Sequence, residues 1–288
     1  MKENKPAKAK WMLAIAMAIF GTLGPFTRQI AVSSGELALY RAVLAAVMIG
    51  GYLLITKQKL DFSAIKREIL LLLLSGIAMG FNWVLLFQAY KYTSISIATL
   101  SYYFAPVLVT VACPFLFREK LTLKQILCFA LSTTGLVMII GVGSGNGQGT
   151  DGIGILYGLG AAVLYATVIL MNKAIKGVTG IHRTLMQFVG AIIILVPYVL
   201  LTEGVNLHLL NTTGWICLLV VGLIHTGITY CLYFSSLKSL KGQSVAILSY
   251  IDPLVAVLIS FFVLGETMTT LQVVGGAMIL GFTLYNEL

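Results

Sequence analysis

Residues 101–125 read SYYFAPVLVTVACPFLFREKLTLKQ, and residues 249–272 read SYIDPLVAVLISFFVLGETMTTLQ. Each stretch begins with Ser-Tyr, continues through a proline into an apolar run, and ends with a glutamate, a threonine and a glutamine. Three pairs keep the same offset of 147 positions, about half of the 288-residue chain: Pro106 with Pro253, Glu119 with Glu266, and Gln125 with Gln272. The chain therefore contains an internal repeat that divides it into two halves.

The composition is that of an integral membrane protein. Hydrophobic residues make up 59% of the chain and charged residues only 10%, whereas soluble domains have roughly 45–50% and about 25%. The mean hydropathy of +0.97 agrees. Membrane proteins concentrate Lys and Arg in cytoplasmic loops, which explains the net charge of +9 better than a nucleic-acid partner does.

The cysteines give no sign of metal or redox chemistry. All four lie in apolar runs, with neither a CxxC spacing nor a paired histidine: Cys113, Cys128, Cys217 and Cys231. They are predicted to be small buried residues, so no disulfide, metal site or cofactor is expected. The first apolar run follows the basic stretch MKENKPAKAK and lacks a small-residue cleavage site, so it is predicted to remain as a membrane helix.

Charged and polar clusters divide the chain into ten apolar runs. Each has roughly the 20 residues that a helix needs to cross the bilayer. The sequence thus predicts an all-α membrane protein with ten transmembrane helices, near residues 11–32, 36–56, 69–90, 94–116, 122–142, 152–173, 182–201, 213–235, 243–264 and 268–286.

The distribution of cations predicts the orientation. With the N-terminus in the cytoplasm, 16 of the 19 Lys and Arg residues fall on the cytoplasmic side. The exceptions are Arg28, Arg41 and Lys91. The positive-inside rule favours this arrangement over the reverse. Because ten crossings is an even number, we expect both termini in the cytoplasm and a multi-pass protein of the cytoplasmic membrane.

The repeat spans five helices, since the first matching stretch is the fourth run and the second is the ninth. Five is odd, so the second half enters the membrane from the opposite side. The halves are therefore predicted to be inverted repeats related by a pseudo-two-fold axis in the membrane plane. We assign residues 1–142 to the first five-helix repeat, residues 143–151 to an outer linker, and residues 152–288 to the second five-helix repeat.

These features resemble a known family. The stretches APVLVTVACPFLFREKLT and DPLVAVLISFFVLGETMT, and Arg41 within ALYRAVLAAVM, are similar to EamA-type carriers of the drug/metabolite transporter (DMT) superfamily. The resemblance covers essentially the whole chain. It implies a ten-helix fold with a central cavity between the halves, lined by helices one, three, four, six, eight and nine. It also implies transport of a small organic metabolite.

Asp252 is the foremost candidate for chemistry inside the membrane. It lies about ten residues into the ninth run, directly before Pro253, whereas the apolar Ala105 precedes Pro106 at the matching position of the other half. A charge in the membrane interior costs about 2.5–3.5 kcal/mol on insertion scales, so its presence requires an explanation. Asp252 is predicted to be a proton-coupling site or a counter-ion for a cationic substrate. The alternative is a residue that bonds backbone freed by a helix kink.

The candidate substrate-binding residues are polar or aromatic and lie within the runs. His225 can change its charge near neutral pH, so it is a second candidate for proton coupling; the alternative is a hydrogen bond between helices. Aromatic faces with a polar edge suit an organic solute and can hold a cation. The substrate-binding set is Asn82, Trp83, Tyr102, Tyr103, Tyr165, His225 and Tyr250.

Other charged residues are expected near the membrane surfaces. Glu119 and Glu266 are predicted to act as helix caps or loop partners. Arg28 and Arg41 are predicted to lie near the outer face, where they either attract an anionic group or extend to the interface.

The leading hypothesis is a secondary active transporter for a small organic metabolite, an amino acid or a related amine. The resemblance to EamA-type carriers implies export rather than import. The partners of the transporter would be that substrate, the lipid bilayer and protons. One alternative is a proton-coupled importer of an organic cation such as choline. A channel is a further alternative, although the runs contain no ring of like charges and no filter sequence. An enzyme is disfavoured because no nucleophile–base pair or HExxH motif is present.

The inverted repeat predicts opposite exposure of two linkers. A single cysteine at Asn146, in a variant without the four native cysteines, should react with an impermeant thiol reagent added outside intact cells. A cysteine at Gln58 should react only after the cells are opened. Labelling of position 146 from the cytoplasmic side alone would contradict the inverted repeat.

Overall fold

The computed structural model describes residues 5–58, 62–117, 122–142, 151–178, 180–202, 204–237, 240 and 248–287. The regular structure of these residues is helical throughout. The first half contains α1 (Lys5–Gly21), α2 (Leu23–Arg28), α3 (Ser34–Ile55), α4 (Phe62–Tyr92), α5 (Ile95–Tyr102), α6 (Ala105–Phe117) and α7 (Leu123–Val142). The second half contains α8 (Asp151–Ala174), α9 (Gly180–Thr202), η1 (Leu207–Leu209), α10 (Thr212–Leu219), η2 (Val220–Ile228), α11 (Thr229–Leu237), α13 (Ile251–Phe262) and α14 (Thr270–Glu287).

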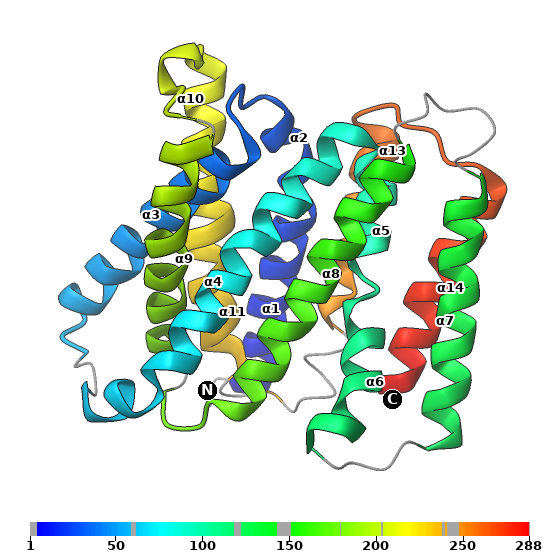
Figure 1. The fold of residues 1–288 in the computed structure, drawn as a ribbon, viewed down its shortest axis with the longest axis horizontal. Helices are drawn as coiled ribbons and strands as arrows, with labels where there is room; N and C mark the ends of the chain where they lie inside the picture. The colour runs from blue at the N-terminus through cyan, green and yellow to red at the C-terminus, as the bar shows by residue number, and fades with distance from the viewer. Residues whose placement is uncertain are drawn as a thin grey trace.

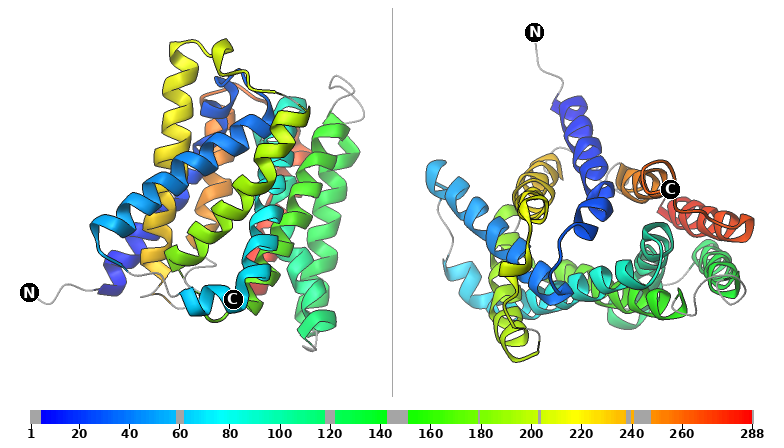
Figure 2. Two further views of the ribbon diagram at one scale, coloured as in Figure 1. Left: turned by 60° about the vertical axis from the view of Figure 1, so that its left-hand side comes forward. Right: turned by 90° about the horizontal axis from the view of Figure 1, so that it is seen from above.

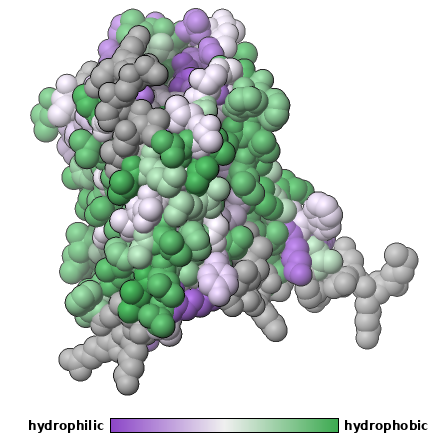
Figure 3. All heavy atoms as spheres, turned by 90° about the vertical axis from the view of Figure 1, so that its right-hand side faces the viewer, coloured by the Kyte–Doolittle hydropathy of each residue, from purple (hydrophilic) through white to green (hydrophobic). Residues whose placement is uncertain are grey.

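These helices form the predicted ten crossings. Within the described residues, seven helical segments are long and apolar enough to span a bilayer, and three shorter apolar helices complete the set. Some crossings combine consecutive helices, such as α1 with α2, α5 with α6, and α10 with η2 and α11. The face that carries α7 and α14 is largely hydrophobic between its ends (Figure 3). Glu119 and positions 143–150 of the predicted linker lie outside the described residues.

The two ends of the described chain lie on the same side of the molecule. In Figure 1, α1 begins and α14 ends at the lower edge, as an even number of crossings requires. We call this the terminal side and the opposite one the far side. Seen from above in Figure 2, α7 and α14 lie next to each other at one edge of the bundle.

The helix contacts obey the symmetry of inverted repeats. Exchanging each crossing with the one five places later converts every major contact between the halves into another observed contact. Thus α4 packs on α8 as α11 packs on α1, α4 packs on α9 as η2 packs on α3, and α6 packs on α8 as α13 packs on α1. The pairs α3 with α9, α5 with α13, and α7 with α14 are each converted into themselves. The fold is therefore two inverted five-helix repeats.

The repeated proline interrupts one helix in each half. A proline lacks a backbone N–H and clashes with the carbonyl four residues earlier, so the first turn of a helix accommodates it best. Pro106 lies at the start of α6, after a break at Tyr103 and Phe104, and Pro253 lies at the start of α13, after a turn at Tyr250. Because α5 packs on α13, the two interrupted crossings meet inside the molecule.

The eighth crossing is irregular for a different reason. Residues Val220–Ile228 form a π-helical segment, in which Thr226 Oγ1 donates to the Val221 carbonyl 2.8 Å away. Such segments are rare and occur often at functional sites. The sequence pattern predicted an ordinary helix here, because hydropathy does not distinguish one helical pitch from another.

Small residues allow the halves to approach closely. A Cβ atom added to Gly76 in α4 would overlap the Gln187 carbonyl of α9, and one added to Gly190 in α9 would lie 2.9 Å from the Leu73 carbonyl. Gly135 in α7 would place a Cβ 2.6 Å from the Gly275 carbonyl of α14. Membrane helices use such glycines because close packing replaces the hydrophobic driving force that lipid removes.

Polar ties connect the two halves at both surfaces. On the far side, Glu266 forms an ion pair with Arg28 and accepts a 3.0 Å hydrogen bond from the Ile95 amide at the start of α5. This confirms the predicted role of Glu266 as a cap and loop partner. On the terminal side, the Glu68 carboxylate accepts hydrogen bonds from the amides of residues 176–178 between α8 and α9.

Gly76→Ala should destabilise the protein, because the new methyl group would push α4 and α9 apart; overpacking costs typically about 1–3 kcal/mol. Gly50→Ala is the matched control, since nothing lies within 4 Å of its added Cβ. Thermal unfolding in detergent should show a lower midpoint for Gly76→Ala and an unchanged or higher one for Gly50→Ala. Equal midpoints would contradict the close α4–α9 contact.

Candidate functional site

Four of the predicted site residues meet where the two interrupted helices pack together. The Tyr103 hydroxyl donates a hydrogen bond to Asp252 Oδ2 over 2.6 Å. The Tyr102 ring stacks on the Tyr165 ring of α8, with centroids 5.1 Å apart, and meets the Tyr103 ring edge-on at 5.9 Å. Since Tyr102 and Tyr103 belong to the first half and the other two to the second, the cluster bridges the inverted repeats.

Asp252 is partly buried in the first turn of α13. In the part of the chain that the structure describes, its hydrogen-bond partner is the Tyr103 hydroxyl rather than a freed backbone amide. An O–H donor at 2.6 Å is in the range of charge-assisted hydrogen bonds. The carboxyl group is thus oriented from the opposite half of the protein, which the kink-bonding alternative does not require.

Arg41 is enclosed by the protein, which contradicts the predicted extension to the interface and leaves the other predicted role, the attraction of an anionic group. Its helix begins at Ser34 behind a capping box of Ser33 and Glu36, which places Arg41 about 10 Å along the axis from that end. The residue is only 3% exposed. Arg41 Nε donates to Thr226 Oγ1 of the π-helical segment over 3.0 Å. An arginine so enclosed cannot extend to the membrane surface.

The Arg41 guanidinium is also held by aromatic rings. Its Cζ lies 4.3 Å from the centre of the Trp83 ring and 5.3 Å from that of Phe87. Such cation–π contacts are strongest when the cation is desolvated. The sequence analysis did not include Arg41 among the site residues. The usable signal was a full charge within a membrane-spanning run, which by itself suggests a functional residue.

Three tyrosines lie near both Arg41 and Asp252. Tyr90, Tyr102 and Tyr230 are each within electrostatic range of both charged groups, whereas neither charged group is among the electrostatic neighbours of the other. We call Arg41, Asp252 and the tyrosines at positions 90, 102, 103, 165 and 230 the central cluster. It combines one cation, one carboxyl group and several aromatic faces from both halves.

Asn82 and Trp83 have different surroundings. Asn82 Nδ2 donates to the Ala161 carbonyl over 2.6 Å, which ties α4 to α8. Trp83 lies beneath Arg41 and is 4% exposed. The structure therefore brings Trp83 to the edge of the central cluster and assigns Asn82 to a contact between helices.

His225 lies within electrostatic range of Arg41, and Tyr250 lies two positions before Asp252 in the chain. His225 Nε2 shares a 3.0 Å hydrogen bond with Thr22 Oγ1, at the break between α1 and α2, and its ring lies 5.0 Å from that of Phe26. This is the bond between helices that was the alternative to a proton-coupling role. Tyr250 is 8% exposed in the turn before α13.

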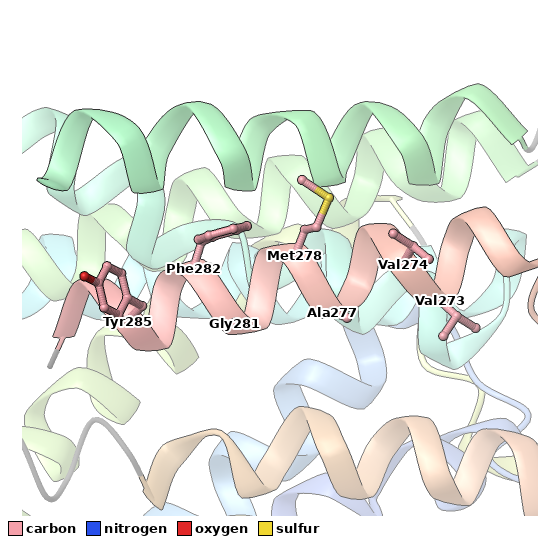
Figure 4. Close-up of a pocket in the computed structure, with 7 residues that line it drawn as sticks. All are labelled: Val273, Val274, Ala277, Met278, Gly281, Phe282 and Tyr285. Carbon is pink, nitrogen blue, oxygen red and sulfur yellow. The ribbon is translucent and has the colours of Figure 1, made fainter.

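An apolar groove on α14 is unsuited to a polar solute. Figure 4 shows the side chains that line it, all from that helix. Tyr285 contributes its polar side-chain atom, and the other lining residues are Val273, Val274, Ala277, Met278, Gly281 and Phe282. In a bilayer, acyl chains cover such a face.

Among the described residues, no group of three or more His, Cys, Asp or Glu side chains is arranged to hold a metal ion.

Comparison with known proteins matches both halves of the chain. The EamA-like transporter family matches residues 7–141 and again residues 152–286. A Bacillus subtilis (strain 168) protein named uncharacterized transporter YxxF is 33% identical over 93% of this chain and 85% of its own length. A Salmonella typhimurium protein named probable amino-acid metabolite efflux pump is 29% identical over 58% of each chain.

A solved crystal structure has a similar fold. It superposes with a TM-score of 0.67 at 17% identity, covering 96% of this chain and 95% of that chain. At this identity the likeness concerns the fold alone. The family match and the relatives identify a membrane transporter with a small-molecule substrate, not an enzyme. The chain belongs to the EamA-like transporter family, within the drug/metabolite transporter superfamily.

Proposed function

We propose that this transporter is a secondary carrier that moves an amino acid or a related amine across the cytoplasmic membrane by alternating access. The observation that carries the proposal is the hydrogen bond between Tyr103 and Asp252, which joins the two inverted halves where both helices are interrupted. Carriers built from inverted repeats bind their substrates at such interrupted helices near the middle of the bilayer.

Alternating access requires that contacts between the halves open on one side at a time. On the far side, two polar contacts join the halves. Glu266 forms an ion pair with Arg28, and the Thr93 hydroxyl donates to Asp151 over 2.9 Å. These polar contacts involve residues close to the membrane surface, where water can replace their hydrogen bonds. They can therefore break without leaving charges unsolvated, whereas the deeply packed helix contacts persist.

Asp252 has two roles compatible with its position. It either exchanges a proton during the cycle, which couples transport to a proton gradient, or it neutralises a cationic group of the substrate. Tyr103 supports both roles, because its hydroxyl stabilises the carboxylate and can be displaced by a stronger donor. His225 is a weaker candidate for proton coupling, since it already bonds Thr22 between helices.

The aromatic faces supply the contact surface for an organic solute. The stacked pair of Tyr102 and Tyr165 combines the fourth and sixth crossings, and Tyr165 is 37% exposed. Trp83 contributes less directly, because Arg41 already covers its face.

Export is favoured over import because a relative is named an amino-acid metabolite efflux pump. We place both termini in the cytoplasm on the distribution of Lys and Arg.

A channel and an importer of organic cations are the competing functions. Within the described residues the crossings present single charges rather than a ring of like charges, which disfavours an ion channel. A carboxyl group among tyrosines is compatible with a bare cation such as choline. The cation Arg41 in the same cluster disfavours such a substrate by repulsion.

Asp252→Asn should abolish accumulation driven by a pH gradient, because the amide keeps the shape but cannot exchange a proton. If Asp252 serves proton coupling, solute counterflow should persist in the same proteoliposomes; if it is a counter-ion, counterflow should slow as well. Asp151→Asn is the control, since the amide oxygen can still accept the bond from Thr93. Normal accumulation by Asp252→Asn would exclude both roles.

Tyr165→Ala should weaken substrate binding by a few-fold to about thirty-fold, which corresponds to roughly 0.5–2 kcal/mol of lost aromatic contact. The matched control is Tyr157→Ala, which removes half of a similar stacked pair with Tyr92, at 5.5 Å between centroids, outside the central cluster. Counterflow measured against substrate concentration checks both variants. Equal effects would assign the Tyr102–Tyr165 pair to helix packing.

A further inference from the structure

Three helix breaks meet beside Asp252. The first crossing breaks at Thr22, between α1 and α2, the fourth breaks after α5, and the ninth turns at Tyr250 before α13. The Tyr103 hydroxyl, just after α5, donates to Asp252 Oδ2 over 2.6 Å. A Cβ added to Gly21, the last residue of α1, would lie 2.6 Å from the Asp252 carbonyl. Direct contacts therefore place the three breaks at one level of the molecule.

A short helix connects each break to the far side. These helices are α2, α5 and α13, and we call them the far-side helices (Figure 1). α13 packs on both α2 and α5. A Cβ added to Gly24 in α2 would overlap the Ile95 side chain of α5. The three helices thus form one packed group between the candidate site and the far side.

One carboxylate joins the far ends of all three helices. Glu266 follows α13 in the chain and accepts a hydrogen bond from Ser260 of that helix. It forms an ion pair with Arg28 of α2 and accepts a 3.0 Å hydrogen bond from the Ile95 amide, at the start of α5. The Glu266 side chain is 12% exposed. Separation of the helices would expose this carboxylate to water at the far side, so its contacts can break and form again.

The far ends of these helices are remote from the candidate site. α5 contains eight residues, which corresponds to a length of about 12 Å between the Ile95 end and the Tyr103 end. A small solute beside Asp252 would therefore not touch Glu266. Any effect of Glu266 on access to the site has to act through the position of the helices.

We propose that the far-side helices form a gate of the carrier, that the breaks beside Asp252 are its hinges, and that Glu266 holds it closed in this structure. This inference rests on the proposed carrier function and adds the element that opens and closes one side. Hinges are typically a few residues at the ends of helices that absorb changes in backbone angles, as these breaks can. The structure is accordingly a state closed to the far side.

The first test measures opening of the gate by labelling from one side. In a variant without the four native cysteines, Tyr165→Cys places a thiol beside Tyr102, at the hinge end of α5. Glu266→Gln removes the ion pair, while its amide oxygen can still accept the bond from Ile95. An impermeant thiol reagent added outside intact cells should then label position 165 about five-fold faster, the shift expected from loss of one partly buried ion pair.

Further variants separate a specific contact from general damage. Arg28→Gln deletes the same ion pair, so it should also raise labelling, and the double variant should label no faster than the faster single variant. Arg28→Lys keeps the pair and should label at the wild-type rate. Glu68→Gln is the matched control, because its carboxylate binds the amides of residues 176–178 on the terminal side. It should leave labelling from outside unchanged.

The outcomes separate the gate from the carrier function. Unchanged labelling in both Glu266→Gln and Arg28→Gln would overturn the role of Glu266, and so would additive effects in the double variant. Labelling needs no substrate, so these results leave the carrier function intact. Solute flux through the wild-type protein without saturation and without counterflow would instead overturn the carrier.

The second test asks whether the three helices move together. Hydrogen exchange of the purified protein, measured by mass spectrometry, should become faster in α2, in the first turn of α5 and at the far end of α13 when Glu266 is replaced by Gln. Peptides that cover residues 176–178 should keep the wild-type rates. If Glu266 only caps α5, exchange should rise in the first turn of α5 and stay at the wild-type rate in α2, which would overturn the gate.

Discussion

The bilayer imposes the constraint on which the whole structure depends: in hydrocarbon, every backbone N–H and C=O must find a partner within the protein. This accounts for helix in every crossing of the described chain. It also explains where irregular backbone is tolerated. The breaks before Pro106 and Pro253, and the π-helical segment that carries Thr226, all lie on crossings that pack between the halves rather than at the edge of the bundle. Polar function is therefore concentrated where the two repeats meet.

Charge follows the same logic. Arg41 and Asp252 would be costly if they faced lipid. Each instead receives or makes a hydrogen bond with a hydroxyl group of the opposite half, and Arg41 also lies over the Trp83 ring of its own half. Glu266 and Glu68, near the two surfaces, serve another purpose, since they cap loops and tie the halves together. The depth of a charged residue thus separates the residues that suit a substrate from those that hold the fold at its surfaces.

The sequence predicted many individual residues of the candidate site, but not which of them lie together. Tyr102, Tyr103, Tyr165 and Asp252 were selected because they are polar or aromatic within apolar runs, and they do meet. Asn82 satisfied the same criterion yet bonds the backbone of α8. Arg41 was assigned to the outer face because it lies early in the second run. The packing of α3 on the π-helical segment, and the rings of Trp83 and Phe87, enclose it.

The sequence by itself determined the class of protein, the ten crossings and the inversion of the halves, because hydropathy and the parity of a repeat are properties of the linear chain. Tertiary structure alone decided which side chains share a site. Tyr103 and Asp252 are 149 positions apart, and Arg41 and Thr226 are 185 apart. Only the packing of one inverted half against the other brings such distant residues within hydrogen-bonding distance. A local sequence pattern does not specify which side chains of two packed helices meet.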